Sequence, residues 1–327
     1  MKKTRAKPKS KAKKRTAARS PRAKKRVSVR LDAPTVLDEP DLKKLLAGMV
    51  RTAHDCGAII RKYHERRGPK SDLKISEKLG AGLVTTADFE SERACVKSLR
   101  KLRPDFGFLT EEGTTLGEAG ESSSGPGAAS ARRRGRWIID PLDGTTNFVH
   151  GLPMFCVSIA AEWDGKIVAG VIEHPILRET YTATLGGGAF LNGKPLRVSA
   201  TASLGDSLLA TGFTYRKTEL LHTEMVAFEE LSSIARAIRR AGSAALDLAY
   251  TARGVFDGFW ERRLSPWDIA AGLLLVREAG GRVTDFRGNE DILGSAAILA
   301  SNGRLHDGLL EAVQTPEEKL RARWNLD

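Results

Sequence analysis

One short stretch, WIIDPLDGTTNF at residues 137–148, constrains the fold of this chain more than any other feature of its sequence. An apolar run reaches Asp140 and is followed at once by Pro141, which has no N–H for a sheet ladder and restricts the residue before it. The sequence therefore predicts a buried strand that ends at Asp140. Gly144 permits a tight bend, and the Thr-Thr-Asn that follows it consists of residue types that cap helices, so a helix is predicted to start there. Asp140 and Asp143 are thereby placed beside a helix N-terminus.

Two interpretations of this stretch differ in function. Carboxylates beside the free N–H groups of a helix N-terminus can bind a hard divalent cation and a phosphate together. The alternative is an ordinary Asp-Gly turn with solvated acids, and the stretch by itself does not decide between them. The neighbouring acidic residues bear on this choice.

Acidic residues stand at the boundaries of three further expected elements: Asp88 after LVTTA, Glu111 and Glu112 after a strand, and Asp268 at the start of a helix. Each has an ordinary interpretation, Asp88 and Asp268 as helix N-caps and Glu111 as a solvated loop acid. Together with the first pair they supply enough oxygen ligands for more than one Mg²⁺. Such ions can activate water and stabilise the attacking and leaving oxygens of a phosphoryl transfer, which predicts hydrolysis of a phosphate ester.

The excess of positive charge is confined to the start of the chain. The net charge is +13 over 327 residues, yet residues 1–30 alone contain fifteen Lys or Arg and no acid, which leaves the remainder close to neutral. Because residues 1–30 have almost no apolar side chains apart from Ala, they cannot bury enough surface to offset the entropy of ordering. We predict a disordered basic tail over residues 1–38. The 41% hydrophobic content of the chain suffices for a sizeable core in the rest.

The compartment is predicted from what the sequence lacks. The basic tail has no apolar h-region of a secretory signal, and no apolar run is long enough to span a bilayer. Cys56, Cys95 and Cys156 are odd in number and widely spaced, which favours reduced, buried thiols over disulfides or a zinc site. These features favour a cytoplasmic protein with no membrane contact.

The periodicity of the chain predicts an α/β (α+β) fold in two halves, with an antiparallel sheet first and a mixed sheet after it. The first half, residues 39–195, would carry the metal site, and the second, residues 196–327, would complete the active site. A flexible loop is expected at residues 113–135 because of its Gly, Ser, Ala and Arg content. Helices are expected at 41–67, 88–102, 219–238 and 267–279, and strands at 106–109, 155–163, 167–173, 179–184, 208–211 and 255–260. Glycine-rich turns at 186–188 and 192–193 are expected to end the first sheet.

Five motifs make the sequence similar to a known family. WIIDPLDGTTNFVHG (137–151), LVTTAD (83–88), FLTEE (108–112), AGSAALDLAYTARG (241–254) and PWDIAAGLLLVREAGG (266–281) resemble motifs of the inositol monophosphatase family in order and spacing. The resemblance runs from about residue 41 to near residue 315. It implies a layered αβαβα sandwich of the inositol monophosphatase/fructose-1,6-bisphosphatase type, a homodimer, sensitivity to Li⁺ and dependence on two to three Mg²⁺ ions.

The resemblance also implies roles for individual residues. Asp88 and Thr145 would orient and deprotonate the attacking water, with Glu111 as a further catalytic residue, and Lys78 would lie near the metal site. Glu112 would be structural. The implied metal ligands are Glu111, Asp140, the carbonyl of Leu142, Asp143 and Asp268. The implied substrate-binding residues are Gly144 and Thr145, whose N–H groups would hold the phosphate, together with Ala244, Glu261, Asp143 and Asp268 around the polyol.

The implied activity is Mg²⁺-dependent hydrolysis of myo-inositol 1-phosphate to inositol and phosphate. Fructose 1,6-bisphosphate, histidinol phosphate and other sugar phosphates stay open as alternative substrates. A different alternative is a transcription factor that contacts RNA or RNA polymerase through the basic tail. Arg262 and Arg263 place two positive charges near the substrate rim, which favours a second phosphate or a larger anionic substrate unless the pair is simply solvated. His150 is expected to be a packing or hydrogen-bonding residue, because imidazole is not a typical Mg²⁺ donor.

Overall fold

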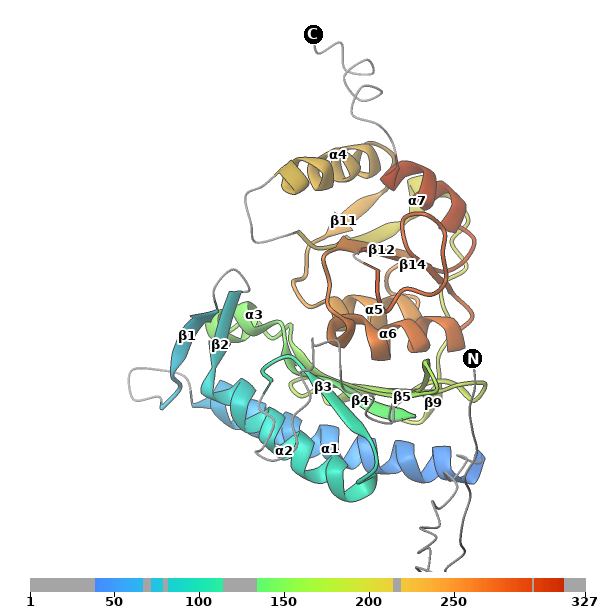
Figure 1. Ribbon diagram of the computed structural model, residues 1–327. Coiled ribbons are helices and arrows are strands. Elements are labelled where there is room, and N and C mark those ends of the chain that lie inside the picture. The colour runs from blue at the N-terminus through green and yellow to red at the C-terminus, as the bar shows by residue number, and fades with distance from the viewer. Residues whose placement is uncertain are drawn as a thin grey trace, which may run out of the picture. The chain divides into compact units, whose positions relative to one another are not determined.

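The computed structural model describes residues 39–66, 72–78, 82–113, 134–213, 219–295 and 297–314. The predicted tail at residues 1–38 and almost all of the predicted loop at 113–135 lie outside these ranges, so both stay predictions. The described elements stack as an α/β sandwich, with two helices, a seven-stranded sheet, two helices, a five-stranded sheet and two outer helices in turn (Figure 1). The predicted layered fold class is thereby confirmed.

The larger sheet has the strand order β3-β4-β5-β6-β7-β8-β9 and is antiparallel except for the β3–β4 pair. The expectation that the turns at 186–188 and 192–193 end this sheet is wrong. They connect it to two more strands, β8 and β9. These strands were missed because they are short and lack apolar alternation. The bounds are β3 Gly107–Thr110, β4 Gly135–Asp143, β5 Cys156–Trp163, β6 Lys166–His174, β7 Glu179–Thr184, β8 Gly188–Leu191 and β9 Lys194–Pro195.

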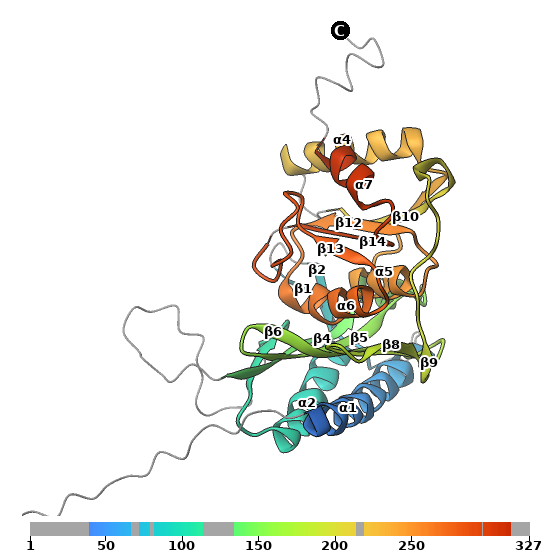
Figure 2. The ribbon, with the colours of Figure 1, turned by 90° about the vertical axis from the view of Figure 1, so that its right-hand side faces the viewer.

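Helices α1 (Glu39–Glu65) and α2 (Thr86–Leu102) cover the outer face of the larger sheet (Figure 2). Every third or fourth residue of α1 is apolar, and these side chains, from Leu45 to Ile60, are at most 2% exposed. Along the chain, α1 is followed by a hairpin of β1 (Ile75–Lys78) and β2 (Gly82–Thr85) before α2 begins. No sequence pattern indicated this hairpin, because each strand has only four residues and neither alternates apolar with polar side chains.

Helices α5 (Ala244–Ala252) and α6 (Pro266–Glu278) form the layer between the sheets. Eight consecutive residues of α6, 269–276, are buried, because the helix is covered by a sheet or by α5 on every side. The two helices approach closely at Gly272, where an added Cβ would lie 2.5 Å from the Leu248 side chain. The same layer supplies thirteen of the thirty buried residues of the main core cluster.

The smaller sheet has the order β11-β10-β12-β14-β13, in which β10 is parallel to both β11 and β12. Outer helices α4 and α7 pack on its far side, on a second apolar cluster. The expected helix at 219–238 is wrong at its end, because residues 237–239 pair with β10 instead. The expected strand at 255–260 lies three residues later. The bounds are β10 Leu208–Thr211, β11 Ala237–Arg239, β12 Gly258–Arg262, β13 Arg282–Thr284, β14 Ala297–Ser301, α4 Glu219–Ile234, α7 His306–Val313 and the 3-10 turn Leu204–Asp206.

The larger sheet lies wholly before residue 196, and the smaller sheet wholly after it. Whether the halves 39–195 and 196–327 are separate domains stays a prediction. All three cysteines are buried and unpaired. Within the described ranges, no helix combines the length and the apolar character that crossing a bilayer requires.

Candidate functional site

The strand that carries the first two acids is longer than its sequence indicates. The prediction that it ends at Asp140 is wrong, since β4 continues to Asp143. Its pairing with β5 shifts register between Asp140 and Asp143, so Pro141 lies at an irregularity where no regular ladder N–H is needed. Both carboxylates consequently project from the irregular end of one strand.

The helix that follows, α3 (Thr145–His150), starts without a side-chain cap. Its N-cap is Gly144 at φ 92°, and a Cβ there would lie 2.7 Å from the carbonyl oxygen of Met154, so glycine is required for both conformation and space. The prediction that Thr145, Thr146 and Asn147 cap this helix is therefore wrong. The Thr145 hydroxyl instead lies 3.0 Å from Asp88 Oδ1 and 3.0 Å from the Leu142 carbonyl oxygen.

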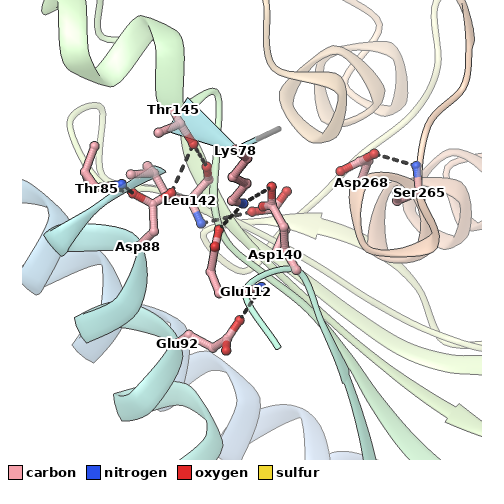
Figure 3. A network of polar contacts seen from close by, with 11 residues as sticks. Lys78, Thr85, Asp88, Glu92, Glu112, Asp140, Leu142, Thr145, Ser265 and Asp268 are labelled. Atoms are coloured by element: carbon pink, nitrogen blue, oxygen red, sulfur yellow. Dashed lines mark hydrogen bonds and ion pairs between the residues drawn. The ribbon is translucent and has the colours of Figure 1, made fainter. Parts of the chain in front are cut away.

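Asp88 belongs to the first turn of α2 but is not its N-cap. The N-cap is Thr85, whose backbone N–H and hydroxyl both donate to Asp88 Oδ2, at 2.8 and 2.6 Å (Figure 3). Burial raises the pKa of Asp88 to about 6, although the hydrogen bonds from Thr85 and Thr145 act in the opposite direction. Asp88 is thus a fixed, fully buried carboxylate whose second oxygen faces the Thr145 hydroxyl.

Three further aspartates accept hydrogen bonds from backbone N–H groups, and one of them also accepts from a serine hydroxyl. Asp140 Oδ1 accepts from the Leu142 N–H at 3.0 Å. Asp143 Oδ2 accepts from the Ser243 hydroxyl at 2.6 Å and from the Ala245 N–H at 2.8 Å. Asp268 stands at the third position of α6, not at its N-cap, and its Oδ2 accepts from the N-cap Ser265 N–H at 2.6 Å.

These carboxylates raise one another's pKa. Burial is the largest cause, and it raises the pKa of Asp143 to about 6 and that of Asp268 to about 8. Asp140 is 2% exposed, and its pKa is raised by burial and then by the nearby charges of Glu111, Asp143 and Asp268. The cluster therefore holds more negative charge than its surroundings neutralise.

Lys78, on strand β1, is the cation that contacts this cluster. Its Nζ lies 2.9 Å from Glu111 Oε1 and 2.5 Å from Glu112 Oε1. Burial raises the pKa of Glu112 to about 7, and the Glu112 N–H donates to Glu92 Oε2 at 2.9 Å (Figure 3). Glu112 thus ties the β1 hairpin and helix α2 to the loop that carries Glu111.

A pocket of about 510 Å³ joins these groups. Asp88 does not line the pocket but lies behind Thr145, which does. His150 is exposed and does not line the pocket. The pocket brings together the other residues singled out from the sequence: Lys78, Glu111, Asp140, Leu142, Asp143, Gly144, Thr145, Ala244, Glu261, Arg262, Arg263 and Asp268. The catalytic and binding roles of these residues stay predictions.

Some lining residues were missed from the sequence, among them Phe213, Arg240, Ser243 and Trp267. Ser243 and Trp267 lie inside the AGSAALD and PWDIAAG motifs, and Arg240 directly precedes the first of these, so a signal was present. Phe213 had no distinguishing pattern.

Glu261, on strand β12, also lines the pocket. A Cβ at Gly212 would overlap the Glu261 carboxylate, so the side chain occupies the space above that glycine. Burial raises the pKa of Glu261 to about 8, while the positive charge of Arg240 acts in the opposite direction. At neutral pH Glu261 is therefore mostly protonated and able to donate as well as accept a hydrogen bond.

The chemistry of the donors fits a hard divalent cation. Among the described residues, no three or more His, Cys, Asp and Glu side chains are arranged as a finished metal site. The donors that line the pocket are nevertheless all oxygens: three aspartates, Glu111 and the Leu142 carbonyl. Oxygen donors of this kind suit Mg²⁺, and a divalent cation would relieve the mutual repulsion that raises the pKa of Asp140.

Comparison with known proteins matches this sequence to one family. The sequence model of the Inositol monophosphatase family matches residues 41–318. An inositol-1-monophosphatase of Mesorhizobium japonicum is 43% identical over 273 residues, which are 83% of this chain and 97% of the relative. The Nus factor SuhB of Pseudomonas aeruginosa is 41% identical, over 84% of this chain and 97% of the relative.

The fold agrees with a solved structure. The crystal structure of the extragenic suppressor protein suhB from Bartonella henselae superposes with a TM-score of 0.73 at 41% identity. The match covers 83% of this chain and 98% of the Bartonella chain.

Proposed function

The chain belongs to the inositol monophosphatase family, a family of phosphatases, and from this premise we propose that it hydrolyses inositol 1-phosphate with the help of Mg²⁺. The observation that carries the proposal is the buried Asp88–Thr145 pair, which lies directly behind a pocket lined by oxygen donors. A pocket of this kind offers a place for a phosphate ester, a cation and a base within reach of one another.

Glu111, Asp140, Asp143, Asp268 and the Leu142 carbonyl would hold two to three Mg²⁺ ions. Lys78 would complete the charge balance at Glu111. When bound, Mg²⁺ polarises the phosphate ester and acidifies water. The resemblance to this family implies sensitivity to Li⁺, and we propose that Li⁺ inhibits the enzyme.

Thr145 and Asp88 would prepare the attacking water. The Thr145 hydroxyl can accept a hydrogen bond from a water molecule in the pocket while it donates its own proton to Asp88 Oδ1. With a pKa of about 6, Asp88 is ionised at neutral pH yet basic enough to take that proton. The N–H and the hydroxyl of Thr85 both donate to Asp88 Oδ2, which fixes the carboxylate and keeps Oδ1 directed at Thr145.

The ester itself would be held from two sides. Gly144 and Thr145 line the pocket next to the acids, and their backbone N–H groups would contact the phosphate. Glu261, with Ala244 and the second oxygen of Asp143, would contact the hydroxyl groups of the polyol. A protonated Glu261 can both donate to and accept from such hydroxyls.

The test is phosphate release from inositol 1-phosphate, fructose 1,6-bisphosphate, histidinol phosphate and adenosine 3′,5′-bisphosphate, with Mg²⁺ and with EDTA. We expect Mg²⁺-dependent release from inositol 1-phosphate that is abolished in Asp143→Asn. Asp307→Asn is the matched control, because its side chain is 91% exposed and pairs with Arg282 at the surface. Failure of a folded protein to release phosphate from any of the four esters would refute the proposal.

A second function is favoured by the basic tail and by the name of one relative, the Nus factor SuhB. Fifteen cationic side chains can bind the phosphate backbone of RNA by counterion release, without a sequence preference. We propose that the tail binds RNA in a transcription complex, in the cytoplasm, on a homodimeric enzyme. Deletion of residues 1–30 should weaken RNA binding at 50 mM salt while phosphate release persists, and equal RNA affinity with and without the tail would refute the idea.

A further inference from the structure

Three parallel strands of the smaller sheet end at the pocket. Because β10 is parallel to β11 and to β12, the carboxyl ends of all three lie at one edge of the sheet. The residues that follow these ends, Gly212, Arg240 and Arg263, all line the pocket. Since β11 and β12 flank β10, the two arginines follow strands that lie two strand spacings, about 10 Å, apart, and the register places Arg240 level with Trp260, three residues before Arg263. Both arginines line the same pocket. We call Arg240 and Arg263 the arginine rim.

Arg263 is the less constrained member of the rim. Its side chain is exposed, and within the described part of the chain it makes no ion pair or side-chain hydrogen bond. Its backbone has φ 59°, a left-handed conformation that costs a non-glycine residue about 1 kcal/mol. A strained cation at the mouth of a pocket is more typical of a ligand contact than of a solvated surface residue.

Arg240 is held in place and contributes charge. Its Nη2 donates to the Phe213 carbonyl oxygen at 3.4 Å, and its positive charge acts on the buried Glu261. Arg262 differs from both, because its guanidinium carbon lies 4.3 Å from the centre of the Phe286 ring and its side chain is half-buried. Of the Arg262–Arg263 pair noted in the sequence, Arg262 thus supports the wall, and Arg263 offers its charge to the pocket.

The pocket therefore carries groups of both charges. Its carboxylate end, lined by Glu111, Asp140 and Asp143, is where a cation and the reacting phosphate would bind, and the arginine rim follows the carboxyl ends of β11 and β12. A neutral polyol offers hydroxyl groups but no negative charge for the two guanidinium groups. Guanidinium groups match phosphate oxygens in geometry and charge.

We propose that the arginine rim binds a second phosphate group of the substrate, so that the enzyme prefers phosphate monoesters that carry another phosphate across the sugar or polyol. This inference rests on the proposed phosphatase function and narrows its substrate class. The reacting phosphate stays at the carboxylate end, and the second phosphate is recognised but not cleaved.

The experiment compares fructose 1,6-bisphosphate with fructose 1-phosphate, which differ only in the second phosphate. We expect kcat/KM to be higher for the bisphosphate, and the ratio of the two values to fall about two- to fivefold in Arg263→Gln, the range for an exposed ion pair in a good geometry. Arg263→Lys should keep most of the preference. Arg239→Gln is the matched control, because Arg239 is exposed and adjacent to Arg240 but does not line the pocket. The preference should also decrease as salt rises from 50 to 500 mM.

A ratio that is the same in the wild type and in Arg263→Gln would overturn the inference. Calorimetric titration of both esters in EDTA measures the same preference as a ratio of Kd values without turnover. If the wild type binds the bisphosphate more tightly and Arg263→Gln loses this preference, the arginine rim binds the second phosphate even if no ester is hydrolysed. The absence of all hydrolysis would then refute only the proposed function. Equal affinity for both esters in the wild type would overturn the inference even if both are hydrolysed.

Discussion

Ser243 couples the stability of helix α5 to the orientation of a carboxylate in the site. Its hydroxyl donates to Asp143 Oδ2 at 2.6 Å and accepts from the Leu246 N–H at 3.4 Å, so the residue is both the N-cap of α5 and a holder of Asp143. In Ser243→Ala the lost cap costs about 1 kcal/mol. The lost hydrogen bond to a carboxylate costs about 1.5 kcal/mol, at the low end because the Ala245 N–H still binds the same oxygen.

The expected loss is therefore about 2 to 3 kcal/mol of unfolding free energy, which corresponds to a decrease of roughly 4–10 °C in Tm for a fold of this size. Removal of a donor also raises the pKa of Asp143 further above its usual range, since the hydrogen bond from Ser243 lowers it. A more easily protonated Asp143 is a poorer ligand, and we expect about tenfold weaker Mg²⁺ binding at pH 7. The difference in Mg²⁺ affinity from the wild type should diminish as the pH rises.

The assay is thermal unfolding in EDTA together with calorimetric titration of Mg²⁺ at pH 6.5 and 8.5. Ser243→Thr retains a hydroxyl and should stay close to the wild type. Ser233→Ala is a matched control, because that hydroxyl donates to the Glu230 carbonyl at the end of α4, away from the pocket. Wild-type Mg²⁺ affinity in a Ser243→Ala protein of reduced stability would refute the coupling between cap and ligand.

Three further predictions follow from the geometry. Thr145→Val should lower kcat by a factor of at least about 100 with little change in KM, because Asp88 loses its route to water, and Thr145→Ser should restore much of kcat in a steady-state phosphate assay. Gly144→Ala should cost more than about 2 kcal/mol in urea unfolding, since a Cβ at φ 92° would lie 2.7 Å from the Met154 carbonyl oxygen; a loss below 0.5 kcal/mol would contradict this. Burial lowers the pKa of His306 to about 4, below its usual 6.5, so its contribution to stability is complete above pH 6.5 and is lost as the pH falls from 6.5 to 4. The loss should be about 2 kcal/mol after allowance for solvent screening, and urea unfolding of His306→Asn should show a shallower decrease over that interval.

Local chemistry made much of the site predictable. The acids of the DPLDGT turn, Asp88, Glu111 and Asp268 each stand where an expected element begins or ends, and the structure places them around one pocket or directly behind it. Helix α1 was predictable for a similar reason, because its buried residues recur at helical spacing along one stretch of chain. In both cases the signal is carried by residues close together in sequence.

Contacts between distant segments account for most of what the sequence did not predict. Residues 237–239 have no strong strand preference, and they form β11 because β10 offers them a parallel partner. The convergence of Arg240 and Arg263 depends on that pairing, so it could not be inferred before the order of the smaller sheet was known. The extension of β4 past Pro141 likewise depends on the register shift against β5.

The aspartates of the site are ordered by the same groups that start the helices. Thr85 caps α2 and holds Asp88, Ser243 caps α5 and holds Asp143, and the N–H of Ser265 at the start of α6 holds Asp268. Free N–H groups and the positive end of the helix dipole stabilise a carboxylate at such positions, which offsets part of the cost of burying it among like charges. Each helix start is consequently more stable with its aspartate ionised, while the pocket as a whole opposes ionisation through burial and mutual repulsion. A bound cation would remove this conflict, so we expect divalent cations to raise Tm, and the more so the more tightly they bind the folded chain. In Asp268→Asn the rise in Tm on addition of the cation should be smaller than in the wild type, whereas the Tm in EDTA should be higher than that of the wild type.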